Sequence, residues 1–281
     1  MRRAVLKLFL LLLILSPFSE IQAQVTEAPN HDAFKRTRNK TREKLSYVHV
    51  READVMWHKT IWRRIDMRQK INLPFYYPFR EKNGRKNFIT MVKQAIEQGE
   101  LTVYKYDVFD DWFEEPLSIE EAMSTMVDSV TRTDYDEQGQ EVTVRDEVPM
   151  ESQDVYELDI KEQWFFDKHR AVMDVRIIGI CPVWLKPTQG GERERLPLFW
   201  IYYPEARDVF INAPVFNRHN DVKKLTYEDL FAKRMFDSYV YKESNVYDRE
   251  IADYAMGIHA LLEAKDIENE IRENEMDLWE Y

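Results

Sequence analysis

Four apolar segments between residues 155 and 211 constrain the fold more than any other part of the chain. They read VYELDI, RAVMDVRIIGI, LPLFWIYY and DVFINA, and each is rich in the β-branched and aromatic residues that favour strands. The turns between them, such as residues 167–168 and 189–191, are short and polar. Parallel strands would need crossover helices, for which there is no room, whereas consecutive strands with short connections usually pair directly. The block at about 155–211 therefore predicts an antiparallel β-meander.

The segment at residues 53–78, ADVMWHKTIWRRIDMRQKINLPFYYP, has a pattern that suggests a helix. Asp54 can serve as an N-cap, and Trp57, Ile61 and Ile65 recur at four-residue steps, as on the apolar face of an amphipathic helix. Pro74 marks the end of that helix. We therefore expect an N-terminal helix to pack on the sheet.

Shorter local signals follow on both sides of the β block. In chain order they predict an extended segment at 73–79, a turn at 83–84, a helix at 88–98 ended by Gly99, a strand at 101–106, a helix from the Ser118–Glu121 capping box to about 126, and a hairpin of 127–133 with 141–148. Thr226 is expected to cap a helix at 227–239. A long charged helix is expected at 246–271, with an apolar face of Ile251, Tyr254, Ala255, Ile258, Leu261 and Leu262. The predicted class is α+β, an antiparallel sheet packed with N-terminal and C-terminal amphipathic helices.

The N-terminus has the pattern of a secretory signal. Basic residues precede the apolar run at 8–15, and Ala23 ends a suitable cleavage sequence. The run is too short to span a bilayer, which takes roughly 20 apolar residues. We expect a signal peptide at 1–23, a flexible basic arm at 24–46 and a single α+β domain at 47–281. With no cysteine near the cleavage point to carry a lipid, membrane attachment would depend on a partner protein.

The charge of the chain narrows the class of partner. The formal net charge is −11, and loss of residues 1–23, with three basic residues and one acidic residue, makes it −13. This excess disfavours nucleic-acid binding. Residues 35–44, KRTRNKTREK, nevertheless hold six positive charges, while acidic residues concentrate at 107–159 and 263–280. Such separation suits head-to-tail association of identical subunits, although a solvated arm explains the basic stretch equally well.

Cys181 is the chain's one cysteine, so no intramolecular disulfide can form in the oxidising compartment that a secretory signal implies. It lies within the apolar run IIGICPV at 177–183. We expect a buried small hydrophobic side chain there in preference to a reactive thiol. The fold must therefore depend on its hydrophobic core, for which a 44% hydrophobic composition with seven Trp, 15 Tyr and 15 Phe is sufficient.

Metal and cofactor motifs fit the sequence poorly. Residues 134–145 begin like a calcium loop, with Asp134, Asp136, Gln138 and Gly139, but Arg145 stands where the bidentate glutamate belongs. The six histidines are scattered without zinc-motif spacing, and seven glycines are too few to favour phosphate loops. We predict no cofactor and no metal.

Paired carboxylates leave one enzymatic alternative open. Asp110–Asp111 and Glu114–Glu115 flank an aromatic pair, Trp112 and Phe113, and glycosidases use two carboxylates near a sugar. Adjacent residues point in different directions, however, so this pairing says little about a shared site. The alternative function is a periplasmic cell-wall-active hydrolase that uses carboxylates.

Three segments with unusual residue combinations carry a family resemblance: residues 55–74, residues 73–78 and residues 197–212, PLFWIYYPEARDVFIN. The chain resembles the GldN/PorN family, periplasmic components of the type IX protein secretion and gliding machinery of Bacteroidetes. The resemblance implies a structural subunit, not an enzyme. It implies an outer-membrane lipoprotein partner of the GldK/PorK type, self-association into a ring on the inner face of the outer membrane, and contact with the periplasmic part of the GldL/GldM motor.

The resemblance transfers no residue-level site, so the interface prediction comes from composition. Tyrosine, tryptophan and arginine dominate the energetics of protein–protein contacts. The expected helix with its two tryptophans is the hypothesis for the lipoprotein-facing surface, and the basic arm is a second hypothesis for contact with a neighbouring subunit. The candidate interface residues are Trp57, Trp62, Tyr76, Tyr77, Tyr202 and Tyr203.

Overall fold

The computed structural model describes residues 42–82, 84–107, 112–135, 141–187, 193–217 and 225–279. The predicted signal peptide, most of the predicted arm and the turn at 136–140 lie outside these ranges. Asp110, Asp111, His31 and His219 lie outside them as well. Among the described residues, no helix has the length and apolar character needed to cross a membrane.

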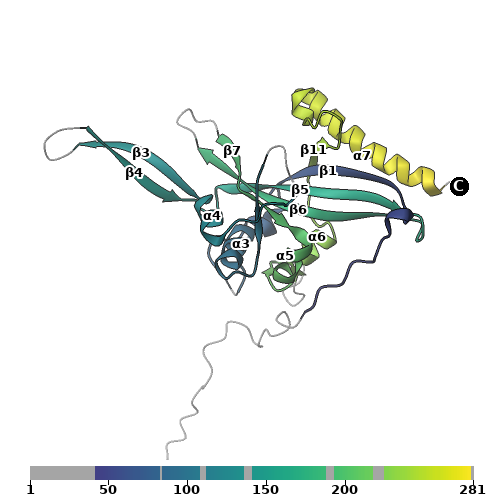
Figure 1. The fold of residues 1–281 in the computed structure, drawn as a ribbon, viewed down its shortest axis with the longest axis horizontal. Coiled ribbons are helices and arrows are strands. Elements are labelled where there is room, and N and C mark those ends of the chain that lie inside the picture. Colours follow the sequence, from purple (N-terminus) through teal and green to yellow (C-terminus); the bar gives the residue numbers. More distant parts are fainter. Residues whose placement is uncertain are drawn as a thin grey trace, which may run out of the picture. The chain divides into compact units, whose positions relative to one another are not determined.

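A seven-stranded sheet organises the described chain (Figure 1). Its strands, in spatial order, are β11 (Tyr239–Glu243), β1 (Val55–Asp66), β5 (Val155–Asp167), β6 (Val172–Pro187), β8 (Phe199–Tyr202) and β2 (Val103–Lys105), with β7 (Arg193–Pro197) also pairing with β6. All pairs are antiparallel. The predicted α+β class is confirmed. The meander is confirmed in β5–β6 and in the pairing of β6 with β7 and β8.

Two small sheets and the helices complete the fold. Strands β3 (Val127–Tyr135) and β4 (Glu141–Pro149) form the predicted hairpin, and β9 (Pro214–Val215) pairs with β10 (Leu225–Thr226). The helices are α2 (Leu73–Tyr76), α3 (Phe88–Glu97), α4 (Ile119–Ser124), α5 (Tyr203–Phe210), α6 (Tyr227–Ala232) and α7 (Ile258–Trp279), with 3-10 turns at Glu52–Asp54 and Ile251–Asp253. The capping box at Ser118–Glu121 and the helix ended by Gly99 (φ 69°) are present as predicted.

The predicted N-terminal helix was wrong, because its residues form strand β1. The spacing of Trp57, Ile61 and Ile65 explains the error: a step of four residues repeats one face of a helix, but it is also an even number and so repeats one face of a strand. Hydrogen bonding to neighbouring strands decides between a helix and a strand here. β1 lies between β5 and β11 and bonds to both.

Two predicted extended segments also prove to be helical. Residues 73–76 form one helical turn, and residues 208–210 of the predicted strand at 208–213 belong to α5. Both helices have a proline in the first turn, Pro74 and Pro204. Proline is tolerated there because the first turn has no partner for its backbone N–H groups, and its fixed φ suits a helix start.

The C-terminal helices differ from the prediction in their bounds and faces. Helix α6 ends at Ala232, well short of residue 239, and Tyr239 begins strand β11. Helix α7 begins only after Gly257, whose φ of 59° interrupts the expected run. Before it, the predicted helix holds only the 3-10 turn at Ile251–Asp253, so the predicted apolar face does not form on one continuous helix. Ile251 and Ala255 are buried, but Ile258, Leu261 and Leu262 are exposed, and α7 buries Ala264, Ile267 and Ile271 instead.

One face of the sheet carries two hydrophobic clusters separated by charge. Ile65 of β1 belongs to the larger cluster under α3, α5 and α6, and Ile61 belongs to the cluster under α7. Between them, fully buried Glu162 accepts a 2.7 Å bond from Arg234, and Arg63 pairs with both Glu162 and Glu268 of α7. Helix α7 thus docks on the sheet through an apolar stripe and ion pairs.

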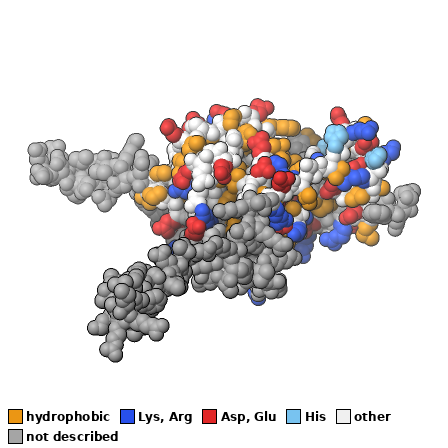
Figure 2. All heavy atoms as spheres, turned by 90° about the horizontal axis from the view of Figure 1, so that it is seen from below, with side chains coloured by type: hydrophobic (Ala, Val, Ile, Leu, Met, Phe, Trp, Pro, Cys, Tyr) orange, Lys and Arg blue, Asp and Glu red, His pale blue; other side chains and the backbone are white. Residues whose placement is uncertain are grey.

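Residues 42–48 take no regular structure and run over α5 and α6. Arg42 pairs with Asp229 at 2.5 Å, and Lys44 pairs with Asp208 at 2.6 Å. Arg207 donates to the Leu45 carbonyl. The surface seen in Figure 2 intersperses acidic, basic and hydrophobic side chains. These contacts engage two of the six cations of the basic stretch within the same chain.

Candidate functional site

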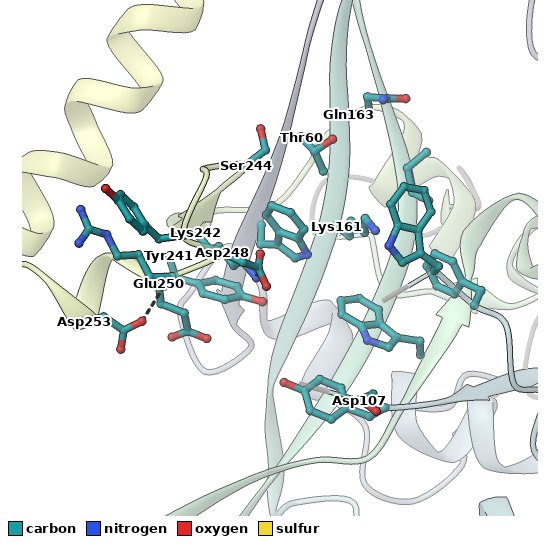
Figure 3. A pocket seen from close by; sticks show the side chains of 18 residues that line it. Thr60, Asp107, Lys161, Gln163, Tyr241, Lys242, Ser244, Asp248, Glu250 and Asp253 are labelled. Atoms are coloured by element: carbon teal, nitrogen blue, oxygen red, sulfur yellow. Dashed lines mark hydrogen bonds and ion pairs between the residues drawn. The ribbon is translucent and has the colours of Figure 1, made fainter. Parts of the chain in front are cut away.

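A cleft of about 880 Å³ lies on the sheet face opposite the two hydrophobic clusters. Side chains of β1, β5, β6, β8 and β11 form its floor, and residues 106–107, residues 112–113 and the segment at 244–253 contribute its walls. Figure 3 shows Thr60 and Gln163 at one end of the cleft, Asp107 at the other, and Tyr241, Asp248 and Glu250 on the side towards α7. Its position on the solvent-facing side of the sheet makes it the main candidate functional site.

A row of cross-strand neighbours starts in the floor of the cleft and continues beside it. From β11 to β8 the row reads Lys242, Trp62, Lys161, Gly179 and Tyr202, each paired with the next in the sheet register. Successive strand residues alternate between faces, so register alone places these five side-chain positions together. The tryptophan is therefore held between two lysines.

The glycine in this row makes room for an aromatic ring from another segment. A Cβ atom at Gly179 would lie 2.5 Å from Cζ of Phe113 and 3.1 Å from Cε3 of Trp200. Phe113 has a φ of 61°, which is unusual for a non-glycine residue and indicates that its surroundings hold it in place. The segment after it is fixed to β2 by a backbone bond from Lys105 to Glu115. Gly179 thus allows Phe113 to close one side of the cleft.

The lysines of the floor lie close to aromatic rings. Nζ of Lys161 is 5.6, 5.4 and 5.7 Å from the ring centroids of Trp62, Trp112 and Phe113. Nζ of Lys242 is 4.8 Å from the Trp62 ring and 2.6 Å from Asp248. A cation over an aromatic face stabilises by about 0.5–2 kcal/mol, depending on solvent access. These contacts orient the two ammonium groups within the cleft.

Polar atoms without protein partners also occur in the cleft wall. Nε1 of Trp200 is buried and has no hydrogen-bond acceptor among the described residues. The Tyr106 ring stacks on this indole at 6.3 Å, and burial raises the pKa of Tyr106 to about 12. Burial also raises the pKa of Tyr241 well above its usual value. Burial thus keeps both tyrosines protonated to a higher pH than a solvent-exposed tyrosine.

A buried ion pair adjoins the cleft. Arg64 donates two hydrogen bonds to Asp159, at 2.7 and 3.1 Å, and its guanidinium lies 4.2 Å from the Tyr241 ring centroid. Burial opposes the charge on Arg64, but the bonds to Asp159 outweigh that cost and raise the arginine pKa. Arg195 also reaches Asp159, at 3.3 Å. This network fixes the sheet next to the cleft.

The carboxylates of the cleft already have structural partners. Asp248 pairs with Lys242, and Asp253 accepts a 2.8 Å bond from the Glu250 backbone N–H. Of the paired carboxylates noted in the sequence, Glu115 is exposed and pairs with Lys105 at 3.0 Å. Within the described ranges no group of three or more His, Cys, Asp and Glu side chains is arranged to hold a metal ion. Cys181 is fully buried, as predicted, and burial raises the pKa of its thiol.

The structure separates the two tryptophans of the interface hypothesis. Trp57 packs on the cluster under α7, whereas Trp62 belongs to the cleft on the other face and is only 8% exposed. Because their segment is a strand, they cannot form the single helical face that was expected.

The four tyrosines of that hypothesis also lie in different surroundings. Tyr76 and Tyr77 form an edge-to-face ring pair, and Tyr77 is 48% exposed. Tyr202 contacts Phe113 in the cleft row, and Tyr203 is buried with its hydroxyl donating to Glu228 at 2.7 Å. The structure therefore places Trp62 in the cleft and Tyr202 next to it, against Phe113, and leaves Tyr77 on a separate exposed surface.

Several cleft residues could not be identified from the sequence. Lys161, Lys242 and Gly179 come together only through strand register, and no local spacing links them. The available signal was the period of two in β1, which places Trp62 and Arg64 on one face and Ile61 and Ile65 on the other.

Comparison with protein-family models identifies the family of this chain. A sequence model of the family described as "Gliding motility associated protein GldN" matches residues 50–280. This chain belongs to the GldN family. The match begins just before β1 and includes the whole sheet and α7, so the cleft is part of the GldN-family region. No curated protein matches the chain. The GldN-family protein is thus a gliding-motility-associated protein.

Proposed function

We propose that this GldN-family protein is a non-catalytic structural subunit of a periplasmic ring complex of the type IX secretion system. The ring would support protein export across the outer membrane and gliding motility. It would attach to the inner face of the outer membrane through a lipoprotein of the GldK/PorK type and would contact the periplasmic part of the GldL/GldM motor. Membership of the GldN family over residues 50–280 is the observation that carries this proposal.

The cleft supports a role in protein contacts. Its walls are aromatic, and aromatic side chains are enriched at the centres of protein–protein interfaces. The carboxylates that the hydrolase alternative would need are engaged in ion pairs and caps at Asp248, Asp253 and Glu115. No observation on the described residues favours that alternative.

The first experiment tests assembly. The full chain is co-expressed with the outer-membrane lipoprotein, and the mass of the purified complex is measured by size-exclusion chromatography with light scattering. We expect a complex of many copies, and we expect deletion of the gene to abolish type IX export and surface movement. A protein that stays monomeric with the lipoprotein, or that degrades purified peptidoglycan, would contradict the proposal.

A second experiment tests the cleft within that assembly. Trp62→Ala is a poor probe, because removal of a buried tryptophan costs about 3–5 kcal/mol of stability. Lys161→Gln with Lys242→Gln removes both ammonium groups and retains much of the side-chain bulk, and Lys265→Gln on the exposed side of α7 is a matched control. If the cleft contacts the lipoprotein, co-purification falls for the cleft variant alone. Equal recovery of both folded variants would exclude the cleft as that contact.

A further inference from the structure

An apolar groove of about 510 Å³ lies at the end of the sheet where β1 finishes. Its apolar walls are Leu73, Pro74, Tyr77, Pro78 and Phe216. Tyr77 and Phe216 are 48% and 46% exposed, although both are large aromatic side chains. A concave apolar patch of this kind on the surface indicates a binding site for a partner.

The rim of the groove is basic. Lys70 and Lys82 lie on it together with Arg85. The neighbouring Lys86 has Glu81 at 3.5 Å, whereas no ion pair within the described ranges engages Lys70 or Lys82. An occupant that combines a large apolar side chain with nearby carboxylates would therefore match the groove in both shape and charge.

The C-terminal segment of the same chain has this composition. Residues 276–281 read MDLWEY, in which Met276, Trp279 and Tyr281 alternate with acidic Asp277 and Glu280. Met276, the first residue of this segment, is 61% exposed. The composition of the segment therefore matches the groove and its basic rim.

The segment cannot reach the groove of its own subunit. Glu268 and Glu270 of α7 pair with Arg63 and Lys59, and the helix ends beside the start of β1 (Figure 1). From Lys59 to Asp66 the strand runs about 23 Å towards the groove. From Glu270 to Trp279 the helix runs about 13 Å the other way, and the two residues beyond it span at most roughly 7 Å.

We propose that the 276–281 segment of one subunit binds the groove of a second copy, with Trp279 between Tyr77 and Phe216 and the acidic residues beside Lys70 and Lys82. This inference rests on the proposed ring function and specifies its subunit contact. Donor segment and acceptor groove are different surfaces, so the contact is heterologous, and repetition of it closes into a ring when the rotation permits.

Cysteine crosslinking tests the contact directly. Two differently tagged full-length copies are co-expressed with the lipoprotein, one with Tyr281→Cys and the other with Arg85→Cys, which leave Trp279, Tyr77 and Phe216 in place, and are treated with a short bismaleimide. We expect a crosslink between the two tags. The matched control replaces Tyr281→Cys with Val246→Cys, which lies in the loop before α7 at a position 98% exposed. A crosslink no stronger than this control would overturn the proposal.

A charge reversal tests the rim. Lys82→Glu or Trp279→Ala is expected to weaken self-association by at least about tenfold, because truncation of a central aromatic anchor commonly costs that much. Glu280→Lys should restore assembly to Lys82→Glu but not to Trp279→Ala. Large complexes that persist unchanged in both variants would overturn the docking contact and leave the ring function intact. A wild-type chain that never self-associates would instead overturn the ring function itself.

Discussion

Gly179→Ala is a test of how the cleft is built, because the structure predicts even the sign of its effect. Gly179 is in a strand and does not have a left-handed φ, so added bulk would ordinarily be tolerated. In a compatible backbone, Gly to Ala stabilises by about 0.4–1 kcal/mol through the unfolded state. Here, however, the new Cβ would be 2.5 Å from the Phe113 ring. We therefore predict destabilisation.

The size of the destabilisation follows from the ring contacts that Phe113 would lose. Its ring makes edge-to-face contacts with Tyr104 at 5.7 Å and Trp200 at 6.0 Å. Each such pair contributes about 0.5–1.5 kcal/mol beyond burial, and overpacking of a core typically costs about 1–3 kcal/mol. We expect a loss of about 1–3 kcal/mol in the free energy of unfolding. That loss corresponds to a decrease in Tm of about 2–4 °C per kcal/mol for a domain of this size.

A double-mutant cycle isolates the contact. Urea unfolding is followed by tryptophan fluorescence and circular dichroism for the wild type, Gly179→Ala, Phe113→Ala and the double variant. Without the ring the alanine methyl has space, so Gly179→Ala should be close to neutral in the Phe113→Ala background. A coupling of at least about 1 kcal/mol is expected, well above the roughly 0.3–0.5 kcal/mol within which independent sites add. Additive effects, or a stabilised Gly179→Ala, would refute this account of the cleft.

Three further predictions concern the stability of variants at buried ionisable side chains. Although burial opposes its ionisation, hydrogen bonds from Arg42 hold the pKa of Asp229 below its usual value. The stability that this pair contributes is present above the unfolded pKa of about 3.9 and declines as the pH falls below it. Asp229→Asn should therefore reduce the loss of stability at acid pH, as measured by urea unfolding at a series of pH values. Burial raises the pKa of Tyr106 to about 12. As the pH rises, the unfolded state therefore loses the Tyr106 proton first, and the free energy of unfolding falls between about pH 10 and 12. Tyr106→Phe should reduce this fall when unfolding is measured at alkaline pH. Asp159→Ala should cost about 3–5 kcal/mol in thermal unfolding, because it leaves the Arg64 charge buried without its carboxylate.

Local signals in the sequence were reliable where one segment determines the outcome. Ser118 and Glu121 form the predicted capping box, and Thr226 caps α6 with Asp229. The hairpin of β3 and β4 was also correct, since its turn and strands are adjacent in the chain. In each case the deciding interaction joins residues that are close in sequence.

Errors arose where distant partners decide the structure. Strand β1 becomes a strand because β5 and β11 supply hydrogen bonds about 100 and 180 residues further along the chain. Strand β11 itself, YVYKE, is short and charged, and it became visible only as a partner of β1. At β1, a four-residue period could not distinguish the two structures, so tertiary pairing overrode local preference.

The same dependence governs the cleft. Its floor combines residues of β1, β5, β6, β8 and β11, from Trp62 to Lys242, and each is placed by pairing with a strand far away in sequence. Residue types typical of interfaces were recognisable from composition, but their grouping was not, because grouping is a property of register. No fragment that lacks β11 can hold the row in which Lys242 and Lys161 flank Trp62. A C-terminal truncation that removes β11 therefore removes the cleft together with the exposed segment of α7, and only point substitutions can separate the contributions of these two surfaces to assembly.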